Sequence, residues 1–255
     1  MRTAASVTLL LASLAVAREV PANLKSFYDS HKNGKCANPV SIAYNSGQKN
    51  ADTHYCKDNG TGAIYLKDTS NGYADVDIDC DGSTTCEGDG SWQGQTAFKD
   101  QVSKFSNGAI KDLNTHIHTF VVLGNDNSKE EGDGGKKFDA TKDGKIEPLS
   151  VVAVVCGDKL VYGVYGDING GKVTGESSLA LAKTCFPNEG LNGNKGHTKH
   201  DVLYLAFPGS DAVAKSAKWG AKTAAEFEAS LAAIGDKLVK KIGSGTKSRI
   251  MRGTL

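Results

Sequence analysis

The spacing of apolar residues predicts one amphipathic helix near each end of the chain. Leu24, Phe27 and Tyr28 lie at helical intervals after Pro21, and Gly34 ends the pattern. From residue 224 to residue 238, an apolar residue recurs every three to four positions. Both segments are therefore expected to form helices at the periphery of a larger core.

Between these helices the pattern changes to short apolar runs and two-residue alternation, separated by turns rich in Gly, Asn and Asp. Cys156-Gly-Asp-Lys159 predicts a hairpin turn, and the acidic, glycine-rich stretch 124–144 predicts a mobile surface loop. No repeat or linker divides the chain. We therefore expect a single mainly β (α+β) domain, with a barrel-like, largely antiparallel core and a few peripheral helices. The predicted strands are 63–67, 73–79, 116–123, 149–156, 160–165 and 202–207.

The start of the chain has the features of a secretory signal. Arg2 precedes an apolar run over residues 7–16, which ends in the small-x-small pattern Ala15-Val-Ala17. The run is shorter than the ~20 residues of a membrane-spanning helix, and no later segment approaches that length. We predict a signal peptide over 1–17, a folded, secreted domain over 18–242, and a disordered basic tail over 243–255.

Composition narrows the possible partners and the redox environment. The 255 residues have a formal net charge of +1, which falls to zero when Arg2 is removed with the signal. This balance of charges disfavours nucleic acid as a partner, because phosphate binding needs a concentrated basic face. Its six cysteines, an even number, predict three disulfides in a secreted protein, with 15 pairings open. The tightest spacing, Cys80 to Cys86, does not match a zinc site.

An acidic strand is the first unusual chemical feature. Alternation places four aspartates on one face of the strand and Val76, Ile78 and Cys80 on the other. Carboxylates at this spacing repel one another, which leaves three interpretations open: a solvated edge, a cation site, or contact with a cationic ligand. The four aspartates are Asp75, Asp77, Asp79 and Asp81.

The same strand partly matches a calcium-binding loop. Asp77, Asp79 and Asp81 fit the opening of an EF-hand, but Gly88 stands where a bidentate glutamate is required. We therefore expect no metal and no other cofactor. A calcium-binding secreted module remains the weakest alternative.

A second feature combines two carboxylates with a glycine-rich loop. An alternating strand ends at Asp167, the loop follows, and Glu176 opens a predicted helix near residues 177–184. Rigid elements on both sides of the loop allow the two carboxyl groups to converge, as acid/base glycoside hydrolysis requires. The alternative is structural, with Asp167 in an Asx turn and Glu176 at a helix N-terminus.

The remaining motifs give weaker indications of function. His197-x-x-His200-Asp201 supplies two possible metal ligands without a third, and we interpret this segment as a surface loop. His116 and His118 are expected to share one face of a strand and to pack there. Neither a nucleophile elbow nor a phosphate-binding glycine loop is present, which disfavours serine hydrolases and P-loop nucleotide binding.

Taken together, these motifs resemble the fungal chitosanases of glycoside hydrolase family 75. The acidic strand 73–82, the strand end Tyr165-Gly-Asp167 and the segment beginning Gly175-Glu176 agree with that family in order and spacing, over about residues 20–242. The resemblance implies a secreted endo-acting hydrolase that cuts β-1,4-linked glucosamine polymers with inversion. It maps the two essential carboxylates onto Asp167 and Glu176 and makes 18–242 the catalytic domain.

We assign Glu176 as the acid and Asp167 as the base, and the reverse assignment remains open. Inversion predicts carboxyl groups ~6.5–9.5 Å apart. The expected partner is chitosan, whose ammonium groups an acidic cleft would attract, and the protein is expected to be a monomer. Alternatives are hydrolysis of another β-1,4 glycan, such as chitin or cellulose, and a non-catalytic, expansin-like binding protein. The predicted cleft lining is Asp75, Asp77, Asp79, Asp81, Tyr73 and Trp92.

Overall fold

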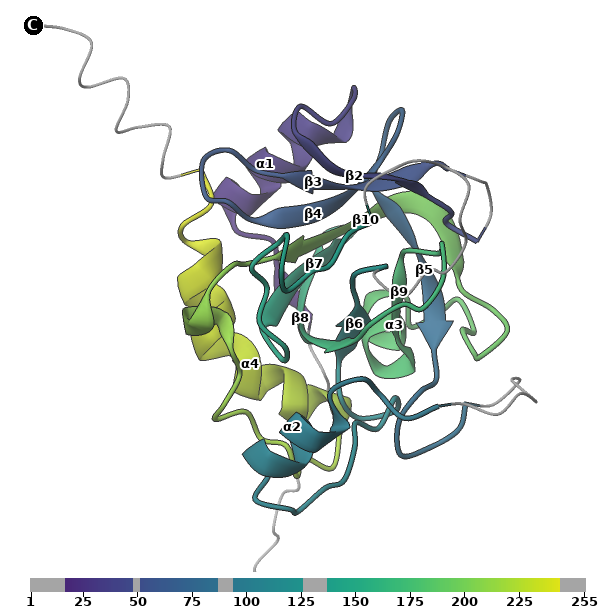
Figure 1. Ribbon diagram of the computed structural model, residues 1–255, viewed down its shortest axis with the longest axis vertical. Helices are drawn as coiled ribbons and strands as arrows, with labels where there is room; N and C mark the ends of the chain where they lie inside the picture. Colours follow the sequence, from purple (N-terminus) through teal and green to yellow (C-terminus); the bar gives the residue numbers. More distant parts are fainter. Residues whose placement is uncertain (1–16, 48–50, 87–93, 126–136, 244–255) are drawn as a thin grey trace, which may run out of the picture.

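Six strands of the computed structural model close into a barrel (Figure 1). The structure describes residues 17–47, 51–86, 94–125 and 137–243. The barrel strands are β5 (Ala74–Asp79), β6 (Phe120–Val122), β7 (Val151–Cys156), β8 (Lys159–Asp167), β9 (Glu176–Ser178) and β10 (His197–Ala206). Around the barrel they follow the order β8, β6, β9, β5, β10 and β7, and β7 pairs back with β8. Only β5 with β9 and β6 with β8 run parallel among the described strand pairs, so the core is mainly antiparallel, as predicted.

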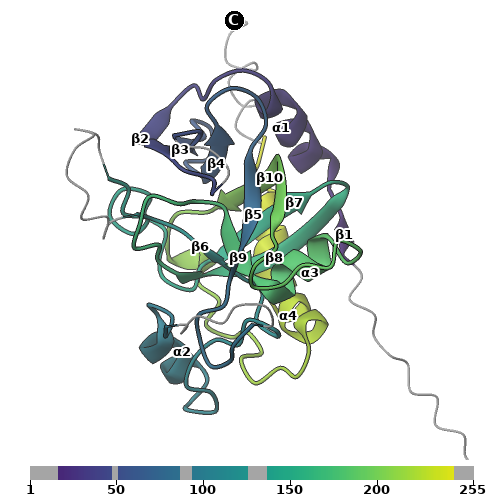
Figure 2. The same ribbon diagram turned by 90° about the vertical axis from the view of Figure 1, so that its right-hand side faces the viewer.

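The remaining elements extend or cover the barrel. A three-stranded layer continues from β10 through β4, as Figure 2 shows, and β1 adds to β8. Helix α4 packs against β7 and β8. The strands are β1 (Arg18–Glu19), β2 (Pro39–Tyr44), β3 (Thr53–Lys57) and β4 (Ile64–Asp68), and the helices are α1 (Ala22–Lys32), α2 (Lys99–Phe105), α3 (Leu179–Cys185), α4 (Ala224–Val239) and the 3-10 helix η1 (Ser210–Ala212).

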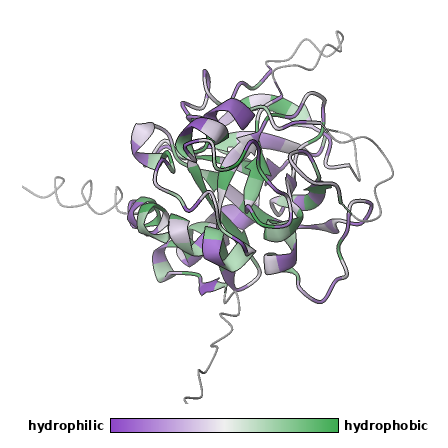
Figure 3. Ribbon diagram, turned by 90° about the horizontal axis from the view of Figure 1, so that it is seen from below, coloured by the Kyte–Doolittle hydropathy of each residue, from purple (hydrophilic) through white to green (hydrophobic). Residues whose placement is uncertain are grey.

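Alternation along the barrel strands divides the apolar residues into two cores. On β7, Val151 and Val155 join a cluster with α1 and α4, whereas Val152 and Val154 join a second cluster on the opposite face with α3. Seen from below, hydrophobic colour follows the central strands, and hydrophilic colour predominates on many of the outer loops (Figure 3). Burial of both strand faces explains why β7 is an uninterrupted apolar run.

The helices begin and pack as the sequence pattern predicts. The Thr223 hydroxyl accepts a hydrogen bond from the Glu226 N–H at 3.2 Å and caps α4. The apolar stripe of α4, including Phe227 and Leu231, is buried in the same cluster as Leu24 of α1. The predicted amphipathic helices at both ends of the chain are therefore confirmed.

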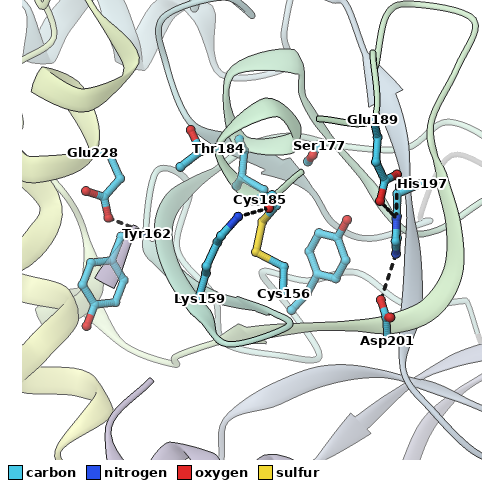
Figure 4. The surroundings of a disulfide bond; sticks show 12 residues. Cys156, Lys159, Tyr162, Ser177, Thr184, Cys185, Glu189, His197, Asp201 and Glu228 are labelled. Carbon is cyan, nitrogen blue, oxygen red and sulfur yellow. Dashed lines mark hydrogen bonds and ion pairs between the residues drawn. A yellow bond between two sulfur atoms is a disulfide. The ribbon is translucent and has the colours of Figure 1, made fainter. Parts of the chain in front are cut away.

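Three disulfides are present, which confirms the prediction from the cysteine count. They join Cys36 to Cys56, Cys80 to Cys86, and Cys156 to Cys185. Figure 4 shows the third, which ties the end of β7 to the end of α3, with the Lys159 ammonium donating to the Cys185 carbonyl at 2.7 Å. This disulfide fixes the short helix that follows Glu176.

Several local predictions were wrong. The predicted strand 116–123 is a strand only over Phe120–Val122, because residues 115–117 form a turn. His116 and His118 therefore do not share a strand face. His118 is buried instead, with its Nδ1 accepting from the Asn114 N–H at 2.8 Å and its Nε2 2.8 Å from the Trp219 carbonyl oxygen.

The segment with His197 and His200 is the first half of β10 and not a surface loop. His197 is buried and stacks on Phe186. Its ring nitrogens lie 2.9 Å from carboxylate oxygens of both Glu189 and Asp201 (Figure 4). Pairing with β5 extends the strand beyond its apolar half, which explains the missed boundary.

The predicted ends of the domain stay predictions. Almost all of the proposed signal (1–17) and of the tail (243–255) lies outside the described residues, as does 126–136 of the predicted mobile loop. Residues 137–144 close that loop with a turn in which Asp139 accepts N–H bonds from Thr141 and Lys142. Within the described ranges, no helix combines the length and apolar character needed to cross a membrane.

Candidate active site

Asp167 stands at the end of β8, where the fold holds its carboxyl group in place. Its side chain is buried, and Oδ1 accepts hydrogen bonds from the N–H groups of Ala97 and Ile168 at 2.8 and 2.7 Å. Burial raises its pKa to about 7, and the negative charges of Asp81 and Asp112 add to the shift. The two N–H donors act in the opposite direction because they favour the carboxylate.

Glu176 opens β9 and is partly exposed. The Asn169 side-chain amide donates a hydrogen bond to its Oε2. Burial of the carboxyl group raises its pKa to about 7, and Asp77, Asp167 and Asp81 contribute in the same direction. The predicted helix begins later than expected, at Leu179, so Glu176 lies on a strand and is not at the helix N-terminus.

Strand register brings these carboxylates into one row across the sheet. Val122 of β6 pairs with Asp167. The antiparallel pairing of Val121 with Ser177 sets Glu176 opposite Val122 on the other side of β6. Two strand spacings, about 10 Å, thus separate the main chains of Asp167 and Glu176. On β5, Asp77 is the register partner of Glu176 and continues the row.

The acidic strand β5 and the segment that follows its end contribute further carboxylates beside Asp167. Asp77, Asp79 and Asp81 are partly exposed, whereas Val76 and Cys80 are buried in the hydrophobic cluster that contains α3 residues. Carboxylate oxygens of Asp79, Asp81 and Asp167 lie within 4.8 Å of one another. Strand alternation and barrel closure therefore gather the acids beside Asp167, in a cluster whose charge suits a cationic group.

Burial raises the pKa values of the carboxyl groups in this cluster. It raises the pKa of Asp77 to about 6 and also raises the pKa values of Asp79 and Asp81. Asp79 accepts the Asp81 N–H at 2.7 Å, and Asp81 accepts the Gly94 N–H at 2.8 Å. Perturbed carboxylates gathered at one surface are typical of a site that transfers protons.

Asp77 lies in a cradle formed by two glycines. A Cβ atom at Gly47 would stand 2.5 Å from Asp77 Oδ2, and one at Gly196 would stand 3.2 Å from Oδ1. A side chain at Gly47 would push the carboxylate away, and one at Gly196 would clash with the Val76 carbonyl oxygen at 2.2 Å as well as crowd Asp77.

Comparison with known proteins identifies the family. The profile described as "Fungal chitosanase of glycosyl hydrolase group 75" matches residues 76–241. An endo-chitosanase of Aspergillus oryzae (strain ATCC 42149 / RIB 40) is 46% identical over 248 residues, which cover 94% of this chain and 98% of the relative. An endo-chitosanase of Aspergillus fumigatus is 46% identical over 246 residues, with the same coverage. Endo-chitosanase B of Aspergillus oryzae (strain ATCC 42149 / RIB 40) is 43% identical over 248 residues, again with the same coverage.

The chain belongs to this chitosanase family. It is therefore a glycoside hydrolase, and the family match includes Asp77, Asp167 and Glu176. The resemblance predicted from the sequence motifs is confirmed.

Not every predicted site residue of this chitosanase family member faces the acid cluster. Tyr73 is fully buried, and its hydroxyl donates to the Tyr28 carbonyl at 2.6 Å, so it cannot stack on a sugar. Asp75 is also fully buried and therefore does not line a cleft. Alternation gives the face of a strand but not the depth of burial along it, and β5 begins deep in the fold. Trp92 lies outside the described residues.

The site also contains residues that are not among those predicted from the sequence. The Ala97 N–H donates a hydrogen bond to Asp167. The N–H of the neighbouring Thr96 donates to Asp112 Oδ2 at 3.1 Å. Asn169 contacts Glu176 from the intervening loop. The Asn169-Gly-Gly pattern indicates a turn and is the one sequence signal for Asn169. Ala97 donates through its main chain, so its residue type gives no signal.

Proposed function

We propose that this protein is a secreted endo-chitosanase that hydrolyses β-1,4 linkages between glucosamine units with inversion, using Glu176 and Asp167 as acid and base. Family membership and the names of the relatives support the activity. The observation that carries the mechanism is the row in which one strand separates Asp167 from Glu176. Main chains about 10 Å apart are compatible with the carboxyl separation of ~6.5–9.5 Å that inversion requires.

In this mechanism the Glu176 carboxylic acid donates its proton to the glycosidic oxygen while the bond from that oxygen to the anomeric carbon breaks. Water attacks the anomeric carbon from the opposite face, and the Asp167 carboxylate takes the proton that this water loses. One proton enters the leaving sugar and one returns to the enzyme, so the reaction balances without a further reactant.

The hydrogen bonds support this assignment of roles. Asp167 accepts two main-chain N–H groups, which stabilise the ionised form that a base needs. Glu176 has three carboxylates as electrostatic neighbours, which favour its protonated form. Burial raises the pKa of both carboxyl groups to about 7, so the assignment rests on the two main-chain donors to Asp167 and not on a difference in pKa.

The acidic cluster supports recognition of a cationic polymer. Asp77, Asp79 and Asp81 are partly exposed and would attract the ammonium groups of glucosamine. An acetylated sugar lacks that charge, so chitin would bind less well. We propose these three aspartates as substrate-binding residues.

Extracellular location is part of the proposal. The three disulfides are typical of secreted proteins, and the sequence of residues 1–17 is typical of a cleaved signal. We further propose that the protein acts as a monomer, with chitosan as its partner.

The test compares highly deacetylated chitosan, chitin and cellulose, measuring viscosity and reducing ends. An endo-chitosanase lowers the viscosity of chitosan early, before many reducing ends appear, and leaves the other polymers largely intact. Glu176→Gln should lower activity on chitosan about 10²–10⁴-fold, the usual contribution of a general acid. The exposed Glu147→Gln is the matched control and should match the wild type. Equal cleavage of chitin, or an active Glu176→Gln variant, would contradict the proposal.

A further inference from the structure

The loop between the two carboxylates holds an amide directly against Glu176. Asn169 is partly buried, and its Nδ2 donates a hydrogen bond to Glu176 Oε2. Its Oδ1 accepts the Gly171 N–H at 2.6 Å, which closes an Asx turn. Both ends of the amide are therefore engaged, one by the loop and one by the carboxyl group.

The turn determines which end of the amide faces Glu176. Because Oδ1 is engaged by the Gly171 N–H, the NH₂ end is directed to the carboxyl group and serves it as a donor. An aspartate at this position would instead set one carboxylate against another.

A second asparagine, Asn125, holds the same loop through two hydrogen bonds. Asn125 Nδ2 donates to the carbonyls of Gly171 and Val173, both at 2.9 Å, and Asn125 is fully buried just beyond β6. The loop is thus fixed to the segment that follows β6, the strand between Asp167 and Glu176. A rigid support of this kind suits a group that must hold a reacting side chain in place.

We propose that Asn169 is a positioning residue for hydrolysis: it holds the Glu176 carboxyl group in place and stabilises the carboxylate formed when the proton passes to the leaving sugar. The proposal rests on the proposed function of Glu176 as the acid. The surrounding Asp77, Asp81 and Asp167 charges oppose formation of that carboxylate, and the Asn169 donor offsets them. The hydrogen bond matters most after proton transfer, when Glu176 is ionised, so it contributes to kcat more than to substrate binding.

Asn169→Ser separates this role from a structural one. A serine hydroxyl is able to accept the Gly171 N–H and keep the turn, but it is too short to reach Glu176 as the amide does. Asn169→Asp adds a carboxylate at the same place. Asn188→Ala, at an exposed position after α3, is the matched control.

We expect Asn169→Ser to lower kcat about tenfold with KM changed less than twofold. The alkaline limb of the kcat profile should move up by about one pH unit, because a lost hydrogen bond to a charged group is worth about that much. Asn169→Asp should lower kcat further, and Asn188→Ala should match the wild type. The ¹³C carboxyl resonance of Glu176, assigned by its loss in Glu176→Gln, should titrate at higher pH in Asn169→Ser.

An unchanged pH profile and an unchanged Glu176 titration in folded Asn169→Ser would overturn the proposal. The titration needs no substrate, so it tests the contact even where activity is low. A fully active Glu176→Gln variant would overturn the proposed function itself, whatever Asn169→Ser shows. An inactive Glu176→Gln with a wild-type-like Asn169→Ser would reject only the role of Asn169.

Discussion

Replacing Asp75 with asparagine should remove part of the pH dependence of folding stability. Asp75 has no exposed surface, and among the described residues neither carboxyl oxygen has a hydrogen-bond partner. Burial and the neighbouring Asp77 raise its pKa to about 9. In the unfolded chain an aspartate has a pKa of about 3.9, so unfolding at neutral pH releases a proton that the folded protein holds.

The sign and size of the effect follow from this difference. Because the folded pKa is the higher one, the stabilisation is complete below pH ~4 and is lost as the pH rises toward 9. Each pH unit in that window costs about 1.4 kcal/mol, or about 4 kcal/mol by pH 7. Asparagine is neutral at every pH and has nearly the same shape, so Asp75→Asn should lack this component.

The assay is urea unfolding of both proteins at pH 5, 6, 7 and 8. The free energy of unfolding of the wild type should fall more steeply with pH than that of Asp75→Asn, by about 1.4 kcal/mol per pH unit. Exposed Asp158→Asn is the control and should keep the wild-type slope. Comparing slopes cancels any constant cost of the buried amide. Identical slopes for Asp75→Asn and wild type would show that Asp75 does not hold a proton in the folded protein at neutral pH.

Three further predictions follow from packing, charge and covalent links. Gly235→Ala should lower the free energy of unfolding in urea by about 1–3 kcal/mol, because the new Cβ would lie 2.5 Å from the Tyr162 ring. Alanine usually favours a helix, so a more stable variant would contradict this prediction. Asp77→Asn should raise KM for chitosan more than it lowers kcat in steady-state kinetics, and an unchanged KM would reject its role in binding. Replacing Cys156 and Cys185 by serine should cost about 3–4 kcal/mol, since their disulfide closes a loop with a sequence separation of 29, and an unchanged unfolding midpoint would count against this.

The elements with clear periodicity could be predicted from the sequence. Helix α4 and strands β7 and β8 have long apolar patterns, and the structure places them close to the expected residues. Strands β2 and β3 were missed because their residues are mostly polar or partly exposed, and α2 because its seven residues bury one side chain, Val102. Such short elements form because neighbouring elements support them, and a local pattern does not record that support.

The candidate site could be predicted only in part. Asp167 and Glu176 were found because they flank a glycine-rich loop, but the partnership of Glu176 with Asp77 depends on β9, a strand of three residues. Alternation correctly grouped the aspartates, yet it could not show that Asp75 lies below the surface and Asp77 at it. Depth of burial and main-chain donors such as Ala97 arise from closure of the barrel.

The stereochemistry of hydrolysis is measured directly by following the anomeric protons by NMR while the enzyme cuts highly deacetylated chitosan. With inversion, the new reducing ends should first appear as the α-anomer, before mutarotation, and Glu176→Gln should give no such signal. First appearance of the β-anomer would indicate retention and a nucleophilic carboxylate. That result would contradict the assignment of Asp167 and Glu176 as an inverting base and acid.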